Sequence, residues 1–299
     1  MDKYNILLID KIKNLEENEI DSFISSRVSV LENKENKTVG LNTDNSIYSG
    51  FLDNKIKVNV TCEYIPVEGF IDTSFGSVVF DDNNIFKYLI KEVKDNDNLY
   101  TAVIKATKKY LFLDHMDRRF NHLEKLRSNM YHEYSATMNK SLSIETFHKN
   151  KSALCLEVSG VVQNMFKFLG IDSDYVIISE LNKVVAKDSK LELHAFNVVY
   201  PEGRDNEAIL FDVSNLTDKR PLVSILSEEQ KNDLLSNKKI VVTNEQINNS
   251  YRMVLDEEIN WKRKTEEYLS LRDGYPETII KNNNPFTIQR KLIFKREKE

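Results

Sequence analysis

The sequence predicts an α+β fold in which one helix packs on an antiparallel sheet. Apolar residues recur at helical spacing across 152–170. Two β-rich runs, 191–200 and 208–215, are separated by a turn-forming segment and predict a β-hairpin. Strand and turn signals dominate 27–80. Farther along, a capping-box signature at Ser227 and Gln230 predicts a short helix, and one at Thr243 and Gln246 predicts a long helix to about Arg272. We therefore expect an N-terminal β-rich addition and a C-terminal helical addition around this core.

Cys155 stands at the predicted start of the helix in 152–170. Ser152 is a candidate N-cap and Gly170 a candidate C-terminal stop, which puts Cys155 in the first turn. The positive end of the helix dipole favours thiolate, the nucleophilic form of cysteine. A lone buried cysteine is more often a small core residue, so the strands that follow decide between the two interpretations.

His194 lies near the start of the first hairpin strand, and Asp212 lies near the end of the second. In an antiparallel pair the start of one strand lies beside the end of the next. We therefore expect His194 and Asp212 to be neighbours, with the helix of Cys155 packed across that edge of the sheet. This is the arrangement of a nucleophile, a base and a group that orients the base.

The run SIETFHKNKSALCLEVSGVVQNMFKFLGIDSDYVIIS, followed by LHAFNVVY and ILFDVS, resembles the core of the transglutaminase-like superfamily. The resemblance covers about residues 142–216. It implies a papain/transglutaminase-like core in which the nucleophile helix packs on an antiparallel sheet. It also implies roles for three residues: Cys155 as nucleophile, His194 as general base and acid, and Asp212 as the residue that orients the imidazole.

The resemblance implies a cysteine-dependent amide hydrolase or peptidase that acts on a protein or peptide substrate through a thioester acyl-enzyme. Two alternatives stay open: a protein-glutamine transamidase (crosslinking) or deamidase, and a catalytically inactive interaction protein with the same fold. The sequence departs from the family pattern at Ala153 and Leu154, where glycine is common, and at Phe196, where tryptophan is common. These departures affect the substrate groove and leave the catalytic atoms in place.

His148 is the rival candidate for the base. It lies in the short predicted helix 142–150, closely before Cys155 in the chain. We favour His194, since papain-like sites take the base from a strand downstream of the nucleophile helix. His148 and Asn150 stay candidates for lining the groove or assisting the oxyanion site.

The remaining histidines and the second cysteine predict no further chemistry. A long helical signal, broken at most once, spans 98–136 and carries His115, His122 and His132, which lack the spacing of three or four that helical metal sites use. Cys62 falls in the alternating strand pattern of 57–64 and is interpreted as a core residue. We expect no metal and no cofactor.

Composition restricts the partners. With 42 basic and 47 acidic residues the formal net charge is −5, which argues against a dedicated nucleic-acid binder. No run approaches the roughly 20 apolar residues of a membrane span, and no signal-peptide core is seen. We therefore expect a cytoplasmic protein with no nucleic-acid and no membrane partner.

Three regions are expected along the 299 residues. Residues 1–95 form an N-terminal β-rich region, either a small domain or an elaboration of the main sheet. Residues 96–220 form the transglutaminase-like catalytic core, and 221–299 form a C-terminal helical extension with a basic tail. The tail from Lys281 onward is interpreted as a final strand or an exposed arm, and it is a candidate docking segment for an acidic partner.

Overall fold

The structure is a computed structural model that describes residues 3–35, 56–58, 77–80, 82–113, 141–151, 153, 155–180, 192–203, 206–217, 220–235, 240–258, 267–269 and 278–281. The described helices are α1 (Lys3–Lys13), η1 (Glu17–Glu19), α2 (Ile20–Glu35), α3 (Asn84–Asp95), α4 (Leu99–Leu111), α6 (Ile144–Asn150), α7 (Cys155–Leu169), α8 (Glu228–Leu235), α9 (Asn244–Ser250) and the π-helix η3 (Tyr251–Leu255). The described strands are β1 (Ile56–Val58), β2 (Ser77–Phe80), β3 (Ser141–Ser143), β4 (Ser173–Glu180), β5 (Glu192–Val199), β6 (Ala208–Thr217), β7 (Arg220–Leu226), β8 (Ile240–Val241), β9 (Glu267–Leu269) and β10 (Thr278–Lys281).

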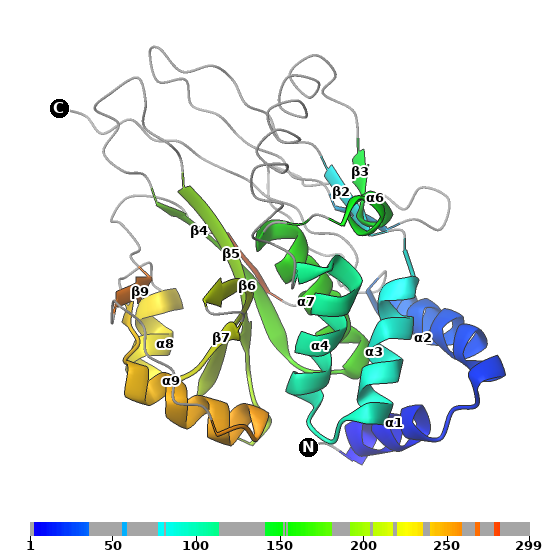
Figure 1. Cartoon of the computed structure of the whole chain (residues 1–299), viewed down its shortest axis with the longest axis horizontal. Coiled ribbons are helices and arrows are strands. Elements are labelled where there is room, and N and C mark those ends of the chain that lie inside the picture. Colours follow the sequence, from blue (N-terminus) through cyan, green and yellow to red (C-terminus); the bar gives the residue numbers. More distant parts are fainter. Residues whose placement is uncertain are drawn as a thin grey trace, which may run out of the picture.

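The centre of the molecule is a sheet with the strand order β10-β4-β5-β6-β7, in which each neighbouring pair is antiparallel. The helix α7 packs on this sheet, and α3 and α4 lie on the other side of α7 (Figure 1). The helices α8 and α9 lie at the β7 end of the sheet (Figure 1). The α+β class and the packing of a helix on an antiparallel sheet are confirmed.

The bounds of α7 agree with the sequence prediction. Its first residue is Cys155, and Gly170 follows its last turn with a φ of 74°, a conformation that glycine adopts without steric cost. The Gly170 N–H donates to the Lys167 carbonyl at 3.0 Å, and the Ile171 N–H donates to the Phe166 carbonyl at 2.8 Å. This pair of hydrogen bonds is the Schellman ending of a helix.

The helix α7 is the middle layer of the core, because it is buried on two opposite sides. Phe166 packs edge-on against Phe211 of β6 with ring centroids 5.0 Å apart. On the other side Phe168 stacks on Phe86 of α3 at 4.4 Å. A helix that is apolar on both sides is stabilised only by burial between two layers.

The prediction of a strand just after Arg27 is wrong, since this stretch belongs to α2. Ile24 and Val28, one helical turn apart, are both buried. Phe23 packs edge-on against Phe168 of α7, and Arg27 Nε donates to the Phe168 carbonyl at 3.1 Å. Packing of one helical face against α7 therefore outweighs the β-propensity of the valines in this segment.

The strand signals farther along the N-terminal region are met in part. The strands β1 and β2 are antiparallel, and β2 also pairs in parallel with β3. The expected strand at 57–64 is described only as far as Val58, so Cys62 lies outside the described residues.

The helical signal predicted across 98–136 is broken at Leu111, where α4 ends. Asn98 caps its start by accepting a hydrogen bond from the Thr101 N–H, and Phe112 ends it with a φ of 55°. The stretch that holds His115, His122 and His132 lies outside the described residues.

The long helix predicted to reach residue 272 ends at Leu255, and β9 occupies part of that range. Asn98 Nδ2 of α4 donates to the Val254 carbonyl at 2.7 Å, and Thr101 Oγ1 donates to the Leu255 carbonyl at 3.3 Å. These donors satisfy carbonyls at the helix end, and Asp256 then leaves the helix with a φ of 55°. The stop is thus supplied by a different helix, which local sequence does not reveal.

The predicted helix starts in the C-terminal region are confirmed. Ser227 and Gln230 form a reciprocal capping box: Gln230 N–H donates to Ser227 Oγ, and Ser227 N–H donates to Gln230 Oε1. Thr243 Oγ1 accepts the Gln246 N–H at 3.1 Å at the start of α9. The strand β10 pairs with β4 and ends at Lys281, so the rest of the tail interpreted as a final strand or exposed arm lies outside the described residues.

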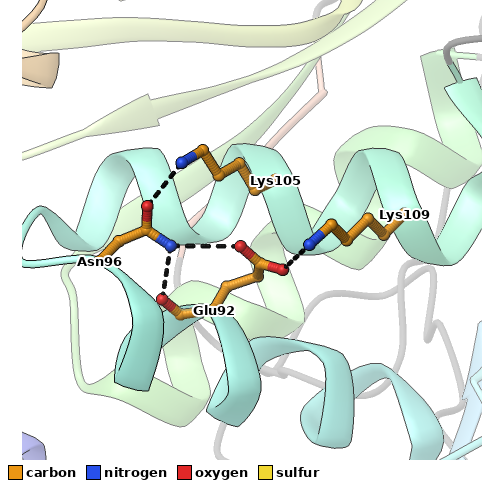
Figure 2. Close-up of polar contacts among 4 residues, drawn as sticks. All are labelled: Glu92, Asn96, Lys105 and Lys109. Carbon is orange, nitrogen blue, oxygen red and sulfur yellow. Dashed lines mark hydrogen bonds and ion pairs between the residues drawn. The ribbon is translucent and has the colours of Figure 1, made fainter.

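A buried carboxylate joins α3 to α4 (Figure 2). Glu92 forms an ion pair with Lys109, and Asn96 Nδ2 donates to Glu92 Oε2 at 3.2 Å. Lys105 Nζ donates to Asn96 Oδ1 at 2.6 Å and extends the network to the surface of α4. This pairing offsets the cost of burying the Glu92 charge between the two helices.

Because of Tyr200, we predict that the stability of the fold depends on pH in the alkaline range. Its hydroxyl donates to Asp174 Oδ2 at 2.7 Å, and burial together with this carboxylate raises the pKa of Tyr200 far above its ordinary value. Above pH 10 a tyrosine of the unfolded chain ionises while Tyr200 stays neutral, so the free energy of unfolding should fall as pH rises. Tyr200→Phe should cost about 1 kcal/mol at pH 7. Urea unfolding from pH 7 to 11 should show this difference shrinking above pH 10, whereas a constant difference would contradict the linkage.

Candidate active site

Cys155 is the first residue of α7, where the predicted thiolate-stabilising field is strongest. Its side chain is half-buried and packs against the hydrophobic core. Ala153, two residues earlier, is 1% exposed and fixes the approach of the chain to the helix. The thiol therefore sits at a defined helix start, where the first backbone N–H groups have no partner within the helix.

A buried polar network fixes the position of α7 along β5. Ser159 Oγ donates to the Ala195 carbonyl at 2.8 Å. Asn197 Nδ2 donates to Gln163 Oε1 at 2.9 Å, and Gln163 Nε2 donates to the Ser173 carbonyl of β4 at 2.9 Å. Because buried polar groups lose free energy when unpaired, sliding the helix along the strand would break several bonds at once.

This network also fixes where the start of α7 lies relative to the start of β5. Ser159 lies one helical turn after Cys155, and Ala195 directly follows His194 in β5. The start of α7 and the start of β5 therefore lie at the same end of the sheet. The sequence pattern does not single out this network, and Gln163, which it assigns away from the packed face of the helix, is buried.

The backbone of His194 lies opposite Ile178 in the β4–β5 pair, and its side chain lies outside the described part of the structure. Asn197 and Phe211 lie opposite each other in the β5–β6 pair and both contact side chains of α7. Positions alternate between the two faces along a strand. His194 and Asp212 therefore occupy positions on one face, while the middle of α7 covers the other. For both to reach Cys155, the contact would have to form at the strand end where α7 begins.

The sheet becomes irregular beside Asp212. The described β5–β6 pairing runs from Val199 to Asn197 and stops before His194. On the other edge of β6, the register against β7 shifts between Asp212 and Thr217. Such irregularities are frequent beside active sites, because they redirect side chains away from the regular pleat.

Asp212 supplies the carboxylate of the predicted site, and it is fully buried, with 0% exposure. Ser214 Oγ donates to its Oδ1 at 2.7 Å. A carboxylate removed from water needs hydrogen-bond or charge partners to stay ionised. Its position in a central strand, next to β5, suits a residue that orients a neighbouring group.

His148, the rival base, is bound to α4. Its Nδ1 lies 2.6 Å from the Tyr110 carbonyl, so Nδ1 carries the proton and donates. The imidazole also stacks on the Tyr110 ring with centroids 4.4 Å apart. One ring nitrogen of His148 is therefore occupied by a structural hydrogen bond. The side chain of Asn150 lies outside the described part of the structure.

Within the described residues, no group of three or more histidine, cysteine, aspartate or glutamate side chains could hold a metal ion. No helix among these residues is both long and apolar enough to cross a membrane.

Comparison of the chain with protein-family models, with curated proteins and with solved structures found no match. The fold defines an α+β protein with a cysteine-initiated helix on an antiparallel sheet. Its function therefore has to be inferred from the residues of the site.

Proposed function

We propose that the chain is a cysteine-dependent amide hydrolase or peptidase with a papain/transglutaminase-like core, acting on a protein or peptide substrate. The observation that carries the proposal is the Ser159–Ala195 hydrogen bond at 2.8 Å. It ties the Cys155 helix, one turn after its start, to the residue after His194. The buried Asp212 on the adjacent strand supports the third role.

In the proposed first step, His194 takes the thiol proton, and the Cys155 sulfur attacks the carbonyl carbon of the amide. The carbon–sulfur bond forms, the carbon–nitrogen bond breaks, and the imidazolium gives its proton to the leaving amine. Asp212 keeps the imidazole in the tautomer that presents its other nitrogen to sulfur, and it stabilises the imidazolium. The start of α7 would support the negative charge on the carbonyl oxygen, because the first backbone N–H groups of a helix have no partner within the helix itself.

In the second step His194 removes a proton from water, which attacks the thioester and releases the acid and the thiolate. The same thioester would give a transamidase if a lysine amine replaced water, or a deamidase if the first substrate were a glutamine side chain. These outcomes share the nucleophile and differ only in the groups that reach the acyl carbon.

Thiol reactivity tests the proposal without knowledge of the substrate. At pH 6 iodoacetamide should label Cys155 in the folded chain at least tenfold faster than in the chain unfolded in urea, where an ordinary thiol has a pKa near 8.5. His194→Ala should remove this advantage, because the imidazolium partner of the thiolate is lost. Labelling read by mass spectrometry at Cys155 and Cys62 separates the two thiols. An unchanged Cys155 rate in His194→Ala from pH 5 to 9 would rule out the pair.

Product analysis separates the reactions. Peptide release from an unfolded protein indicates a peptidase, ammonia release indicates a deamidase, and incorporation of a fluorescent amine into a glutamine-rich protein indicates a transamidase. A reactive Cys155 with none of these products would favour a different acyl donor. An unreactive Cys155 would favour the non-catalytic alternative.

A further inference from the structure

We propose that His148 is a positioning residue for Cys155: it binds the C-terminal end of α4 and, through the four residues that connect α6 to α7, sets the point at which α7 begins. This inference rests on the proposed function, because it concerns the reactivity of the proposed nucleophile. It assigns His148 a role through Cys155 rather than through contact with substrate.

The first element is a helix cap. The last carbonyls of a helix have no partner inside the helix, and the Tyr110 carbonyl belongs to this group in α4. His148 Nδ1 donates to it at 2.6 Å. A histidine at a helix C-terminus is also favoured by the negative end of the helix dipole. His148 of α6 thus serves as a cap for a different helix.

The second element is a set of rings that hold the imidazole on several sides. The His148 ring is nearly parallel to Tyr110, with an interplanar angle of 7°, and it stacks on Phe112 at 5.4 Å. Tyr88 of α3 meets it edge-on at 5.9 Å. Tyr110 is itself fixed, because its buried hydroxyl donates to Asp82 Oδ2 at 2.8 Å. The imidazole therefore packs on groups that have little freedom to move.

The third element is the turn that leads to Cys155. Lys151 adopts a φ of 52°, and its N–H donates to the His148 carbonyl at 3.1 Å. Its Nζ lies 4.9 Å from the centre of the Phe112 ring, a cation–π contact with the residue that ends α4. A left-handed conformation at a non-glycine residue is strained and persists only when its surroundings hold it. The buried Ala153 then anchors the chain before α7 starts.

The helix α4 contacts α7 as well, so α6 and α7 both pack against α4. Thr107 Oγ1 lies 3.4 Å from Met165 Sδ, and the Tyr100 ring packs edge-on against Phe166 at 6.2 Å. A shift of α6 relative to α4 is therefore also a shift relative to α7, and only four residues connect α6 to α7. Loss of the His148 contacts should let the first turn of α7 fray and take the thiol away from the N–H groups that stabilise its anion.

The test measures the pH profile of Cys155 labelling by iodoacetamide in the full chain with Cys62→Ser. His148→Ala should raise the midpoint of the profile by about one pH unit, which lowers the labelling rate roughly tenfold below the midpoint. His148→Phe keeps a ring for the stack on Tyr110 and Phe112, so its midpoint should lie at least halfway back toward that of the parent chain. Urea unfolding of each variant reports global stability.

Leu234→Ala is the matched control, because it removes a buried side chain from α8 at the β7 end of the sheet. It should lower the free energy of unfolding and leave the labelling midpoint unchanged. An unchanged midpoint in His148→Ala, or an equal shift in Leu234→Ala, would overturn the positioning role while leaving the catalytic proposal intact. An ordinary thiol profile in the parent chain would instead overturn the catalytic proposal. The positioning role, which rests on that proposal, would then fall with it.

Discussion

Cys155→Ala should abolish amide hydrolysis and amine incorporation, whereas Cys62→Ser should keep the wild-type rate. Without the thiol no thioester can form, and the loss of a catalytic nucleophile costs several orders of magnitude in rate. The fold should survive, because the change removes one sulfur from a half-buried side chain, and alanine is the best helix former. We expect the free energy of unfolding to change by less than about 1 kcal/mol.

The two variants form a matched pair, since each removes one thiol from a chain that has two. Mass spectrometry of the chain quenched during turnover should show an acyl adduct on Cys155 in the Cys62→Ser variant and none in Cys155→Ala. Residual turnover in Cys155→Ala above one per cent of the wild-type rate would mean that the chemistry belongs to another group.

The central part of the fold could be predicted because its signals are local. The bounds of α7 follow from its apolar spacing and from Gly170, whose φ of 74° ends the helix without strain. The hairpin of β5 and β6 follows from two β-rich runs around a turn. Each of these signals stands within a few residues of the structure that it specifies.

The errors arise where distant residues decide the outcome. The valines after Arg27 favour a strand, yet contacts with Phe168 of α7 place them in α2. The end of the C-terminal helix depends on Asn98 and Thr101, far upstream in α4. Local patterns contain no record of these tertiary contacts.

The sequence indicates the order of the candidate site residues along the chain, and it indicates only part of the contacts that surround them. The succession of Cys155, His194 and Asp212 suggests one strand end, and the register puts the latter two on one face of adjacent strands. The Ser159–Gln163–Asn197 network has no distinctive sequence signal, because polar residues on a helix usually face water. The one sequence signal for this network is the pair Ser159 and Gln163, two polar residues four positions apart in a largely apolar helix.

Asp212→Asn provides the second large expected effect. The amide keeps the shape of the carboxylate, and its oxygen can still accept the Ser214 hydroxyl, now 2.7 Å from Oδ1. It lacks the negative charge that stabilises an imidazolium, and its NH₂ group cannot accept the ring proton of His194. The imidazole should then adopt the wrong tautomer, and turnover should fall by about three to four orders of magnitude. The labelling midpoint of Cys155 should rise, since the ion pair with the thiolate loses its support.

Asp174→Asn is the control that separates this role from the general cost of changing a buried aspartate. Asp174 is 4% exposed in the same sheet, and it also accepts a hydrogen bond from a hydroxyl, that of Tyr200 at 2.7 Å. Both variants should lower the free energy of unfolding by about 1–3 kcal/mol, because each weakens a buried charged hydrogen bond. Only Asp212→Asn should change turnover and the pH profile of Cys155. Equal losses of turnover in the two variants would show that Asp212 supports the sheet and not the imidazole, and the catalytic group on β6 would then have to be sought elsewhere.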